Sequence, residues 1–355
     1  MNKQSIVFTG GGSAGHVTPN IAIINELSNE KWTLHYIGSK KGIEKELISA
    51  MNIPYYGISS GKLRRYIDAE NVKDLFRVLK GIAEARNLLK RLKPNLVFSK
   101  GGFVSVPVII AASTLKIPIY IHESDLTPGL ANKISQRFAT KIFTSFEEAA
   151  KHFPAYKTDA IGSPIRREIF SGDKEKGIKF LGFNKEKPIL TVMGGSLGAK
   201  KINETIRDSL KELTSQYQVV HLCGKGLKDE GLNNITGYQQ FEYINKELPN
   251  ILAATNAVVT RGGSNAIFEF LALKIPMLII PLTKKQSRGD QILNAESFMN
   301  KGYALTLEEE NLTKNSLIQS LENLEKSREK IISSMESSPI GDTLSVLIKE
   351  IGNNY

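Results

Sequence analysis

The chain has 355 residues, more than one hydrophobic core usually holds, so two domains are expected. Its composition, 41% hydrophobic and 23% charged, is typical of a globular protein. No stretch approaches the roughly 18 apolar residues of a transmembrane helix. Residues 1–4 lead directly into a strand pattern, so no signal peptide is expected. The single cysteine, Cys223, excludes an internal disulfide framework and a cysteine-cluster metal site. We therefore expect a cytoplasmic protein.

The net charge of +11 is uneven, because residues 1–163 carry +9 and residues 164–355 carry +2. An acidic partner should therefore meet the first half. Much of the excess lies in segment 62–93, which holds ten cationic and four acidic residues. A basic amphipathic helix there suits an anionic membrane surface, whereas the alternative is an ordinary solvated helix face. Aromatic residues are not interleaved with the charges, so we predict no nucleic-acid partner.

Short apolar strands alternate with helical patterns through the first half of the chain. The expected strands are 5–9, 33–38, 55–58, 95–99, 117–122, 140–144 and 157–161. The expected helices are 18–28, 42–51, 68–92, one opening near Ser105, and 128–138. The apolar positions of helix 68–92 that should share one face are Val72, Leu75, Phe76, Leu79, Ile82, Ala83, Leu89 and Leu92. This alternation predicts a parallel sheet with helices on both faces.

The same pattern restarts after a link at residues 161–164. The expected strands are 188–193, 217–222, 257–260 and 276–280. The expected helices are 199–213, 265–273, 290–300, 314–335 and 342–351. We therefore predict an α/β protein of two doubly wound domains, residues 1–163 and 164–340, followed by a short helix within 341–355.

Four glycines lie within residues 10–15, between a predicted strand and the helix that opens at Thr18. Such a turn directs backbone N–H groups and a helix N-terminus at one point, which suits phosphate. The spacing also fits the dinucleotide fingerprint, but the next strand ends at residues 38–41 without the acid that would hold a ribose. An NADP-dependent oxidoreductase using Lys40 and Lys41 stays open as an alternative. No Gly-Lys-Ser/Thr sequence supports a Walker-type site.

Two residues are candidates for proton transfer. His16 lies inside the first glycine turn, where it can accept a proton from a hydroxyl near pH 7 or simply brace the loop. Glu123 follows His122 at a strand end, where it can orient a sugar, hold a proton or cap the next helix. The two roles of His16 and the three of Glu123 stay open from the sequence alone.

The glycine turns of the second half repeat those of the first: 194–198 matches 11–15, and 262–263 matches 101–102. Neither Asp-x-Asp nor a cluster with metal-ligand spacing occurs, so we predict neither metal nor cofactor. A leaving diphosphate would then be stabilised by backbone N–H groups, Ser196 and Arg166. Glu269 can reach ribose hydroxyls from a helix. The alternatives are a hinge salt bridge for Arg166 and a helix-dipole contact for Glu269.

Seven motifs, in this order along nearly the whole chain, resemble the MurG family of bacterial N-acetylglucosaminyltransferases. They are Gly-Gly-Ser-Ala-Gly-His-Val-Thr-Pro (11–19), Gly-Gly-Phe-Val-Ser-Val-Pro (101–107), His-Glu (122–123), Gly-Ser-Pro-Ile-Arg (162–166), Met-Gly-Gly-Ser-Leu-Gly-Ala (193–199), Arg-Gly-Gly-Ser-Asn (261–265) and Asp-Gln-Ile-Leu-Asn-Ala (290–295). The resemblance implies a GT-B fold, in which two Rossmann-like domains face each other across a cleft. It also implies that the last helix packs on the first domain.

The resemblance implies transfer of GlcNAc from UDP-GlcNAc to the C4 hydroxyl of MurNAc in lipid I, with inversion, yielding lipid II for peptidoglycan at the cytoplasmic face of the membrane. The implied donor-binding residues are Arg166, Ser196, Ile244, Ser264, Asn265, Glu269 and Gln291. The implied acceptor-binding residues are Gly11, Gly12, Ser13, Ala14, Gly15, Gly101 and Gly102, with His16 as the favoured base. The chain departs from the family pattern at Ser124-Asp125, where many members have Gln-Asn, and at Asp290, where many have Gln.

Two other functions remain as alternatives to this transferase. A related isomerase of the same fold would act on UDP-GlcNAc without an acceptor. A non-enzymatic nucleotide-sugar binder would tolerate loss of His16 and Glu269. The three differ in whether the donor is consumed and whether consumption needs the acceptor.

Overall fold

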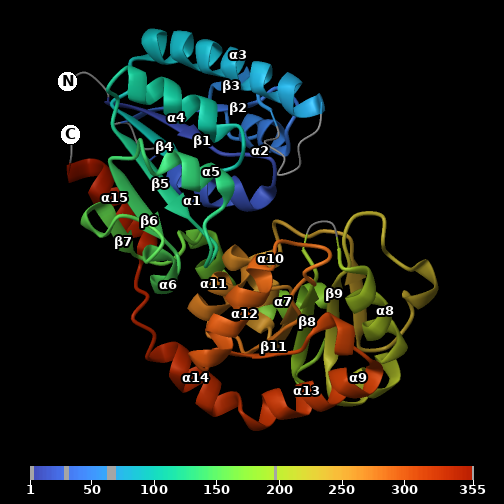
Figure 1. Ribbon diagram of the computed structural model, residues 1–355. Helices are drawn as coiled ribbons and strands as arrows, with labels where there is room; N and C mark the ends of the chain where they lie inside the picture. The colour runs from blue at the N-terminus through green and yellow to red at the C-terminus, as the bar shows by residue number, and fades with distance from the viewer. Residues whose placement is uncertain (1–3, 28–31, 62–68, 196–197, 354–355) are drawn as a thin grey trace. The chain divides into compact units, whose positions relative to one another are not determined.

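The computed structural model describes residues 4–27, 32–61, 69–195 and 198–353. The chain divides into two units, one of Met1–Arg166 with Ile340–Tyr355 and the other of Arg167–Pro339 (Figure 1). The boundary after Arg166 lies just beyond the predicted link at residues 161–164. Ser196, Leu197 and residues 62–68 lie outside the described residues, as do the predictions that fall on them.

The first unit is built on a parallel sheet in the order β3-β2-β1-β4-β5-β6-β7. Its strands are β1 (Gln4–Thr9), β2 (Trp32–Ser39), β3 (Tyr55–Ile58), β4 (Leu96–Ser99), β5 (Ile119–Glu123), β6 (Lys141–Thr144) and β7 (Thr158–Ala160). All the carboxyl ends lie at one edge, and the strand order reverses between β1 and β4. In open α/β sheets this reversal point is where ligands bind.

Helices cover both faces of that sheet, because successive strand residues point to opposite sides. Phe8 and its neighbours pack against α1 (Thr18–Leu27), α2 (Ile43–Ser49) and α15 (Thr343–Asn353). Val7 lies in the opposite cluster, under α3 (Ala69–Leu92) and α4 (Ser105–Thr114). The shorter helices are α5 (Leu130–Ser135) and α6 (Glu147–Ala150).

The last helix, α15, belongs to the first unit although it follows the whole second unit in sequence. Leu344, Leu347 and Ile351 are buried in the cluster around Phe8. Fully burying an aliphatic side chain contributes about 1.5–3 kcal/mol, so these three anchor the end of the chain. An ion pair of 2.6 Å between Lys141 and Glu350 adds a polar contact.

The second unit has a parallel sheet in the order β10-β9-β8-β11-β12-β13, the same winding as the first six strands of the other sheet. Its strands are β8 (Ile189–Met193), β9 (Gln218–Leu222), β10 (Tyr238–Phe241), β11 (Ala257–Thr260), β12 (Met277–Ile279) and β13 (Ala304–Thr306). Its helices are α7 (Lys174–Leu181), α8 (Lys200–Asp208), α9 (Leu210–Gln216), α10 (Leu248–Ala254), α11 (Ser264–Ala272), α12 (Asp290–Asn300), α13 (Lys314–Lys326) and α14 (Arg328–Glu336). The predicted internal repeat is therefore a repeat of topology.

Short 3-10 turns complete the described elements: η1 (Ala14–His16), η2 (Ala155–Lys157), η3 (Arg167–Ser171), η4 (Glu230–Leu232) and η5 (Glu309–Asn311). No helix among the described residues is long and apolar enough to cross a membrane. Two predicted helices are wrong in extent, since 199–213 and 314–335 are each two helices. The breaks lie at Ser209 and Ser327, where the backbone leaves the helical region.

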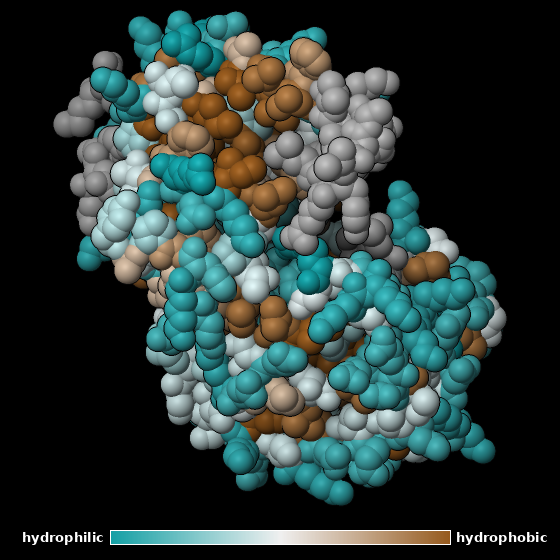
Figure 2. Space-filling view, viewed as in Figure 1, coloured by the Kyte–Doolittle hydropathy of each residue, from teal (hydrophilic) through white to brown (hydrophobic). Residues whose placement is uncertain are grey.

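Helix α3 carries two apolar faces rather than the single predicted one. Leu75, Phe76 and Leu79 point outward, with exposed fractions of 54%, 68% and 54%. Figure 2 shows apolar side chains gathered on the first unit, over the region where Figure 1 draws α3 and α4. The side chain of Val72 lies outside those described. The α3 residues in the core cluster against the sheet are Ala85 and Leu89, with Ile82 and Leu92 packed beside them, and Val78 is also buried.

Candidate active site

The first glycine turn, residues 10–15, follows β1 and is held in place from α2 and β2. The backbone N–H of Gly12 donates to Glu44 Oε2 at 3.2 Å. The carbonyl oxygen of Gly10 accepts from the Tyr36 hydroxyl at 2.9 Å. Gly12 has φ +86°, a left-handed conformation that favours glycine. The turn is therefore fixed before any ligand arrives.

Glu44 is a fully buried carboxylate at this turn. Besides Gly12, it accepts from the backbone N–H of Ser39 at 3.0 Å and from the Ser39 hydroxyl at 2.5 Å. Burial, together with the Glu44 charge, raises the pKa of Tyr55. Because the Gly12 N–H already serves an anion, a bound phosphate would have to use other N–H groups of the turn.

The second glycine turn follows β4 and packs directly on the first. Gly102 has φ +84°, and a Cβ added there would lie 2.2 Å from the carbonyl oxygen of Gly11. Only glycine permits this approach of two backbones. The predicted acceptor residues Gly11, Gly12, Gly101 and Gly102 are therefore brought together by the fold.

His16, in η1, bonds across to the second turn. Its Nδ1 lies 3.0 Å from the carbonyl oxygen of Lys100. A carbonyl oxygen only accepts, so Nδ1 carries the proton and Nε2 of the neutral ring carries a lone pair. The two predicted roles of His16 are thus compatible: the ring braces the loop through Nδ1 and presents a basic nitrogen at Nε2.

His122 and Glu123 end β5, and both are buried. His122 Nε2 lies 3.0 Å from the carbonyl oxygen of Gly162, and its Nδ1 lies 2.5 Å from Lys100 Nζ. Burial, and then the Lys100 charge, hold the pKa of His122 well below its ordinary value. The ring is therefore neutral, with its proton on Nε2.

The Glu123 carboxylate holds the turn that leads into α5. Oε1 accepts from the Asp125 N–H at 3.0 Å, while Oε2 accepts from the Gly129 N–H at 3.0 Å and from Asn132 Nδ2 at 2.9 Å. Burial, and then the neighbouring Asp125 charge, raise the pKa of Glu123. Of the three predicted roles, this geometry favours support of the helix start.

Lys100 directly precedes the second glycine turn and is 1% exposed. Its ammonium donates to His122 Nδ1 and, at 2.6 Å, to Ser124 Oγ. Burial lowers the pKa of Lys100, and the charges of Glu123 and Asp125 oppose that change. The carboxyl edge of the first sheet thus combines a backbone cradle, an oriented histidine and a buried cation.

In the second unit, the glycine turn after β8 is packed against the loop after β9. A Cβ at Gly198 would lie 2.2 Å from the carbonyl oxygen of Cys223. Burial raises the pKa of the Cys223 thiol, so this cysteine is structural rather than reactive. Ser196, predicted to bind the donor from this turn, lies outside the described residues.

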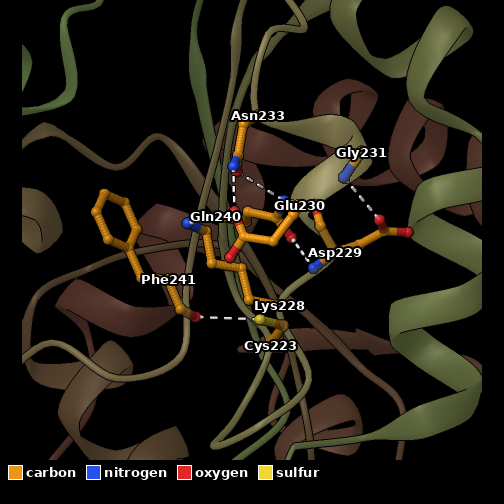
Figure 3. A network of polar contacts seen from close by, with 8 residues as sticks. All are labelled: Cys223, Lys228, Asp229, Glu230, Gly231, Asn233, Gln240 and Phe241. Atoms are coloured by element: carbon orange, nitrogen blue, oxygen red, sulfur yellow. Dashed lines mark hydrogen bonds and ion pairs between the residues drawn. The ribbon is translucent and has the colours of Figure 1, made fainter.

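A polar network fixes the loop after β9 to β10 (Figure 3). The Asp229 N–H donates to Gln240 Oε1 at 3.0 Å, and the Asp229 carboxylate accepts from the Gly231 N–H at 3.0 Å. The Cys223 thiol donates to the carbonyl oxygen of Phe241 at 3.3 Å. These bonds hold the loop beside the second-unit glycine turn.

The turn after β11 carries most of the remaining donor candidates. Arg261 is buried in an ion pair with Glu309 and also donates to the carbonyl oxygen of Ile280 at 3.1 Å. Asn294 Nδ2 donates to the carbonyl oxygen of Gly262 at 3.0 Å. The motifs at 261–265 and 290–295 are separate in sequence, but this hydrogen bond joins them in the fold.

The donor candidates Ser264, Asn265 and Glu269 lie on α11. Ser264 and Asn265 begin the helix, whereas Glu269 is half-buried and lies past the first turn, which contains no acidic residue. The helix-dipole alternative for Glu269 is therefore wrong. Gln291 is the second residue of α12, and its Oε1 accepts from the Leu282 N–H at 3.2 Å.

Two further donor candidates lie away from α11. Ile244 is buried in the segment before α10. Arg166 ends the first unit, immediately before the second begins. Among the described residues, no group of three or more histidine, cysteine, aspartate or glutamate side chains could hold a metal ion.

Comparison with known proteins agrees with these features. The model of the glycosyltransferase family 28 N-terminal domain matches residues 6–144, and that of the family 28 C-terminal domain matches residues 189–351. A Bacillus cereus protein is 57% identical over 348 residues, which are 98% of this chain and 99% of that protein. It is named UDP-N-acetylglucosamine--N-acetylmuramyl-(pentapeptide) pyrophosphoryl-undecaprenol N-acetylglucosamine transferase 2.

The chain belongs to glycosyltransferase family 28. These matches confirm the predicted resemblance to the MurG family. They also confirm the predicted two-domain GT-B fold and the predicted activity class, an N-acetylglucosaminyltransferase.

Solved structures support the same fold for this family 28 chain. The MurG structure from Acinetobacter baumannii has a TM-score of 0.76 at 23% identity, covering 99% of this chain and all of that one. A UDP-GlcNAc 2-epimerase from Methanocaldococcus jannaschii has a TM-score of 0.62 at 14% identity, covering 99% and 100% of the two chains. Likeness at such identity shows the fold alone, so the isomerase alternative gains no support from it.

Two residues of this edge, Lys100 and Glu44, are missing from the sequence-based site. In sequence Lys100 is one more cation before a glycine pair. Glu44 lies three residues after the strand end at residues 38–41, which lacks the ribose-binding acid of the dinucleotide fingerprint. The sequence signals for them are weak: Glu44 lies in α2, beyond the strand end, and Lys100 directly follows β4.

Proposed function

We propose that this chain transfers GlcNAc from UDP-GlcNAc to the C4 hydroxyl of MurNAc in the undecaprenyl-diphosphate-linked acceptor, lipid I, forming lipid II and UDP. The 57% identity to the named transferase over 98% of the chain supports the pair of substrates. The observation that carries the mechanism is the His16–Lys100 bond, because it leaves the basic Nε2 lone pair on the imidazole.

The chemical step is a single displacement at the anomeric carbon. The acceptor C4 oxygen forms a bond to C1 of GlcNAc as the bond from C1 to the UDP oxygen breaks. The hydroxyl proton passes to His16 Nε2, and UDP leaves with the electron pair. One displacement inverts the anomeric centre. Glu123 supports the turn at the end of β5 rather than exchanging this proton.

The second unit supplies the donor contacts in this proposal. Backbone N–H groups at the start of α11, near Ser264 and Asn265, face the diphosphate, and Glu269 accepts from the ribose hydroxyls. The family resemblance adds four further contacts, those of Arg166, Ser196, Ile244 and Gln291. The N-terminus of α11 and Arg166 stabilise the negative charge that develops on the departing UDP, so the reaction needs no divalent metal.

The first unit supplies the acceptor contacts. The backbone of Gly11, Ser13, Ala14 and Gly15, with Gly101 and Gly102, lines the edge where the diphosphate of the acceptor binds. Gly12 shapes the turn through its positive φ, while its own N–H serves Glu44. The acceptor hydroxyl then lies on the same edge as His16.

The decisive experiment follows UDP release from UDP-GlcNAc by the purified chain, with and without a lipid I analogue and with EDTA present. Release only with the analogue, undiminished by EDTA, is the expected result. Consumption of donor without acceptor would favour the isomerase. Binding of donor without consumption under any condition would favour the non-enzymatic binder. A strict requirement for added metal would contradict the proposed charge stabilisation.

We also propose that α3 places the enzyme on the anionic cytoplasmic face of the membrane. Leu75, Phe76 and Leu79 expose an apolar face, and the exposed cations Lys80 and Lys90 lie on the same helix. Apolar insertion combined with attraction to anionic lipid is how interfacial helices bind.

This membrane contact is tested with sedimented vesicles containing anionic lipid. Phe76→Glu and Leu79→Glu should each weaken binding several-fold, and Lys80→Glu should weaken it more at low salt than at high salt. Phe170→Glu, at an exposed phenylalanine of the second unit, is the matched control and should bind as the wild type does. Equal binding by all four variants would refute the proposal.

A further inference from the structure

Glu44, on α2, is a buried carboxylate that takes no part in the chemical step described above. It accepts from the backbone N–H of Gly12 at 3.2 Å, from the backbone N–H of Ser39 at 3.0 Å and from the Ser39 hydroxyl at 2.5 Å. A buried carboxylate is costly unless hydrogen-bond donors surround it. These three donors therefore hold Glu44 in one position, between the first glycine turn and the end of β2.

Three glycines surround this carboxylate, and none of them has a left-handed backbone: Gly11, Gly38 and Gly42. A Cβ added at Gly11 would lie 2.5 Å from Glu44 Cδ, and one added at Gly42 would lie even closer to Glu44 Oε2. A Cβ added at Gly38 would meet the Tyr55 hydroxyl and, at 2.9 Å, Glu44 Cγ. Conformation does not require glycine at these three positions, so the space taken by the Glu44 side chain does.

The Glu44–Gly12 bond reaches the part of the chain that is assigned to the acceptor. Gly12 lies in the middle of the first glycine turn, and η1, which carries His16, begins two residues later at Ala14. A turn that an internal carboxylate already orders does not have to be ordered by the incoming diphosphate. Such preorganisation lowers the free-energy cost of binding.

We propose that Glu44 is a positioning residue, whose carboxylate holds the first glycine turn in the conformation that binds the acceptor diphosphate. Gly11, Gly38 and Gly42 leave room for this carboxylate. Glu44 acts through the Gly12 N–H and not on the reacting atoms. This inference rests on the proposed function, because the turn is assigned to the acceptor there.

The test is a cycle of four full-length proteins: wild type, Glu44→Ala, Gly42→Ala and the double variant. Glu44→Ala should raise KM for a lipid I analogue about tenfold, because the charged acceptor of the Gly12 N–H is lost. Gly42→Ala should raise it similarly, because the backbone at φ −81° accepts alanine but the new methyl group displaces the carboxylate. In the double variant no carboxylate remains to be displaced, so KM should stay near that of Glu44→Ala.

KM for the two substrates separates positioning from loss of stability. A smaller folded fraction lowers kcat and leaves both KM values unchanged, whereas a displaced turn raises KM for the acceptor alone. KM for UDP-GlcNAc should stay within about twofold in every variant, since the donor contacts are assigned to the second unit.

Two further variants complete the test. Glu44→Gln keeps the size of the side chain but replaces one acceptor oxygen by a donor, so its acceptor KM should lie between those of wild type and Glu44→Ala. It also tests the bond without emptying the site. Glu46→Gln, at an exposed glutamate of the same helix, is the matched control and should keep both wild-type KM values. Thermal unfolding of every variant monitors folding.

Three outcomes would overturn the inference. The first is an acceptor KM that stays at the wild-type value in both Glu44→Ala and Glu44→Gln. The second is a double variant in which the effects of Glu44→Ala and Gly42→Ala multiply. The third is a rise in KM for UDP-GlcNAc instead of the acceptor. If the wild type itself transfers no GlcNAc, the proposed function fails instead, and the two failures are distinguished.

Discussion

His16 Nδ1 lies 3.0 Å from the carbonyl oxygen of Lys100, which joins the first glycine turn to the second. A main-chain acceptor at this position cannot be removed by changing a side chain, so the tautomer of His16 is set by the fold itself. The bracing and basic functions of His16 therefore lie on different ring nitrogens, and a substitution can remove one while keeping the other.

His16→Gln should abolish most turnover without disturbing the turn. The glutamine amide can donate to the Lys100 carbonyl oxygen but has no basic lone pair, so kcat should fall by about 10²–10⁴. KM for both substrates should change little. Single-turnover transfer measures the loss, and His152→Gln, at an exposed histidine, provides the control. A His16→Gln enzyme retaining about half of wild-type kcat would show that another group takes the proton.

Glu269→Gln should weaken donor binding rather than chemistry. Loss of the carboxylate removes a charged acceptor for ribose hydroxyls, so the Kd for UDP should rise about tenfold. Calorimetry with UDP and with 2′-deoxy-UDP tests the contact directly, because the wild type should discriminate between them and the variant should not. Glu296→Gln, on the exposed side of α12, should bind UDP normally. Preserved discrimination in Glu269→Gln would place the ribose elsewhere.

Gly102→Ala should destabilise the first unit and lower activity together. The new Cβ would lie 2.2 Å from the carbonyl oxygen of Gly11, in a backbone with φ +84°. Backbone strain and overlap of this kind cost about 2–4 kcal/mol. Urea unfolding measures the change. At Gly341 an added Cβ would meet no heavy atom within 4 Å apart from its chain neighbours. The free energy of unfolding of Gly341→Ala should therefore stay within about 0.5 kcal/mol of the wild-type value.

Most of the fold could be predicted because strands and helices alternate with clear apolar runs. The predicted strands 55–58 and 257–260 coincide with β3 and β11, and helix 290–300 coincides with α12. The breaks at Ser209 and Ser327 were missed because apolar spacing continues through them. Within α9, Leu213 is buried in the second unit, so tertiary packing accounts for the periodicity on both sides of Ser209.

The candidate site was predictable only where glycines mark it. The turns at 10–15 and 101–102 follow predicted strands, so their meeting at one sheet edge follows from topology. Lys100 and Glu44 instead take their importance from partners distant in sequence, since Lys100 bonds Ser124 and Glu44 bonds Gly12. Composition and residue spacing do not reveal such contacts. They also do not reveal which apolar residues of α3 face outward.

The buried Lys100 also predicts how stability depends on pH. Burial lowers the pKa of Lys100 from its ordinary value of 10.5 to about 7, so between these values the unfolded chain holds a proton that the folded chain has lost. Stability from this group therefore rises with pH from about 7 to 10.5, with a slope of up to about 1.4 kcal/mol per pH unit, and is flat below about 7. Glu123 acts oppositely: its raised pKa makes stability fall as pH rises from 4.5 through its folded value.

The difference between wild type and Lys100→Met isolates the lysine. Urea unfolding at several values between pH 6 and pH 10 should show the wild type gaining stability relative to the variant above about pH 7, and a constant difference below it. Lys151→Met should track the wild type throughout, because Lys151 is exposed in the folded protein. A constant difference between wild type and Lys100→Met across the whole range would mean that Lys100 keeps an ordinary proton affinity in the folded protein. The ammonium would then be better compensated by Glu123 and Asp125 than its burial implies.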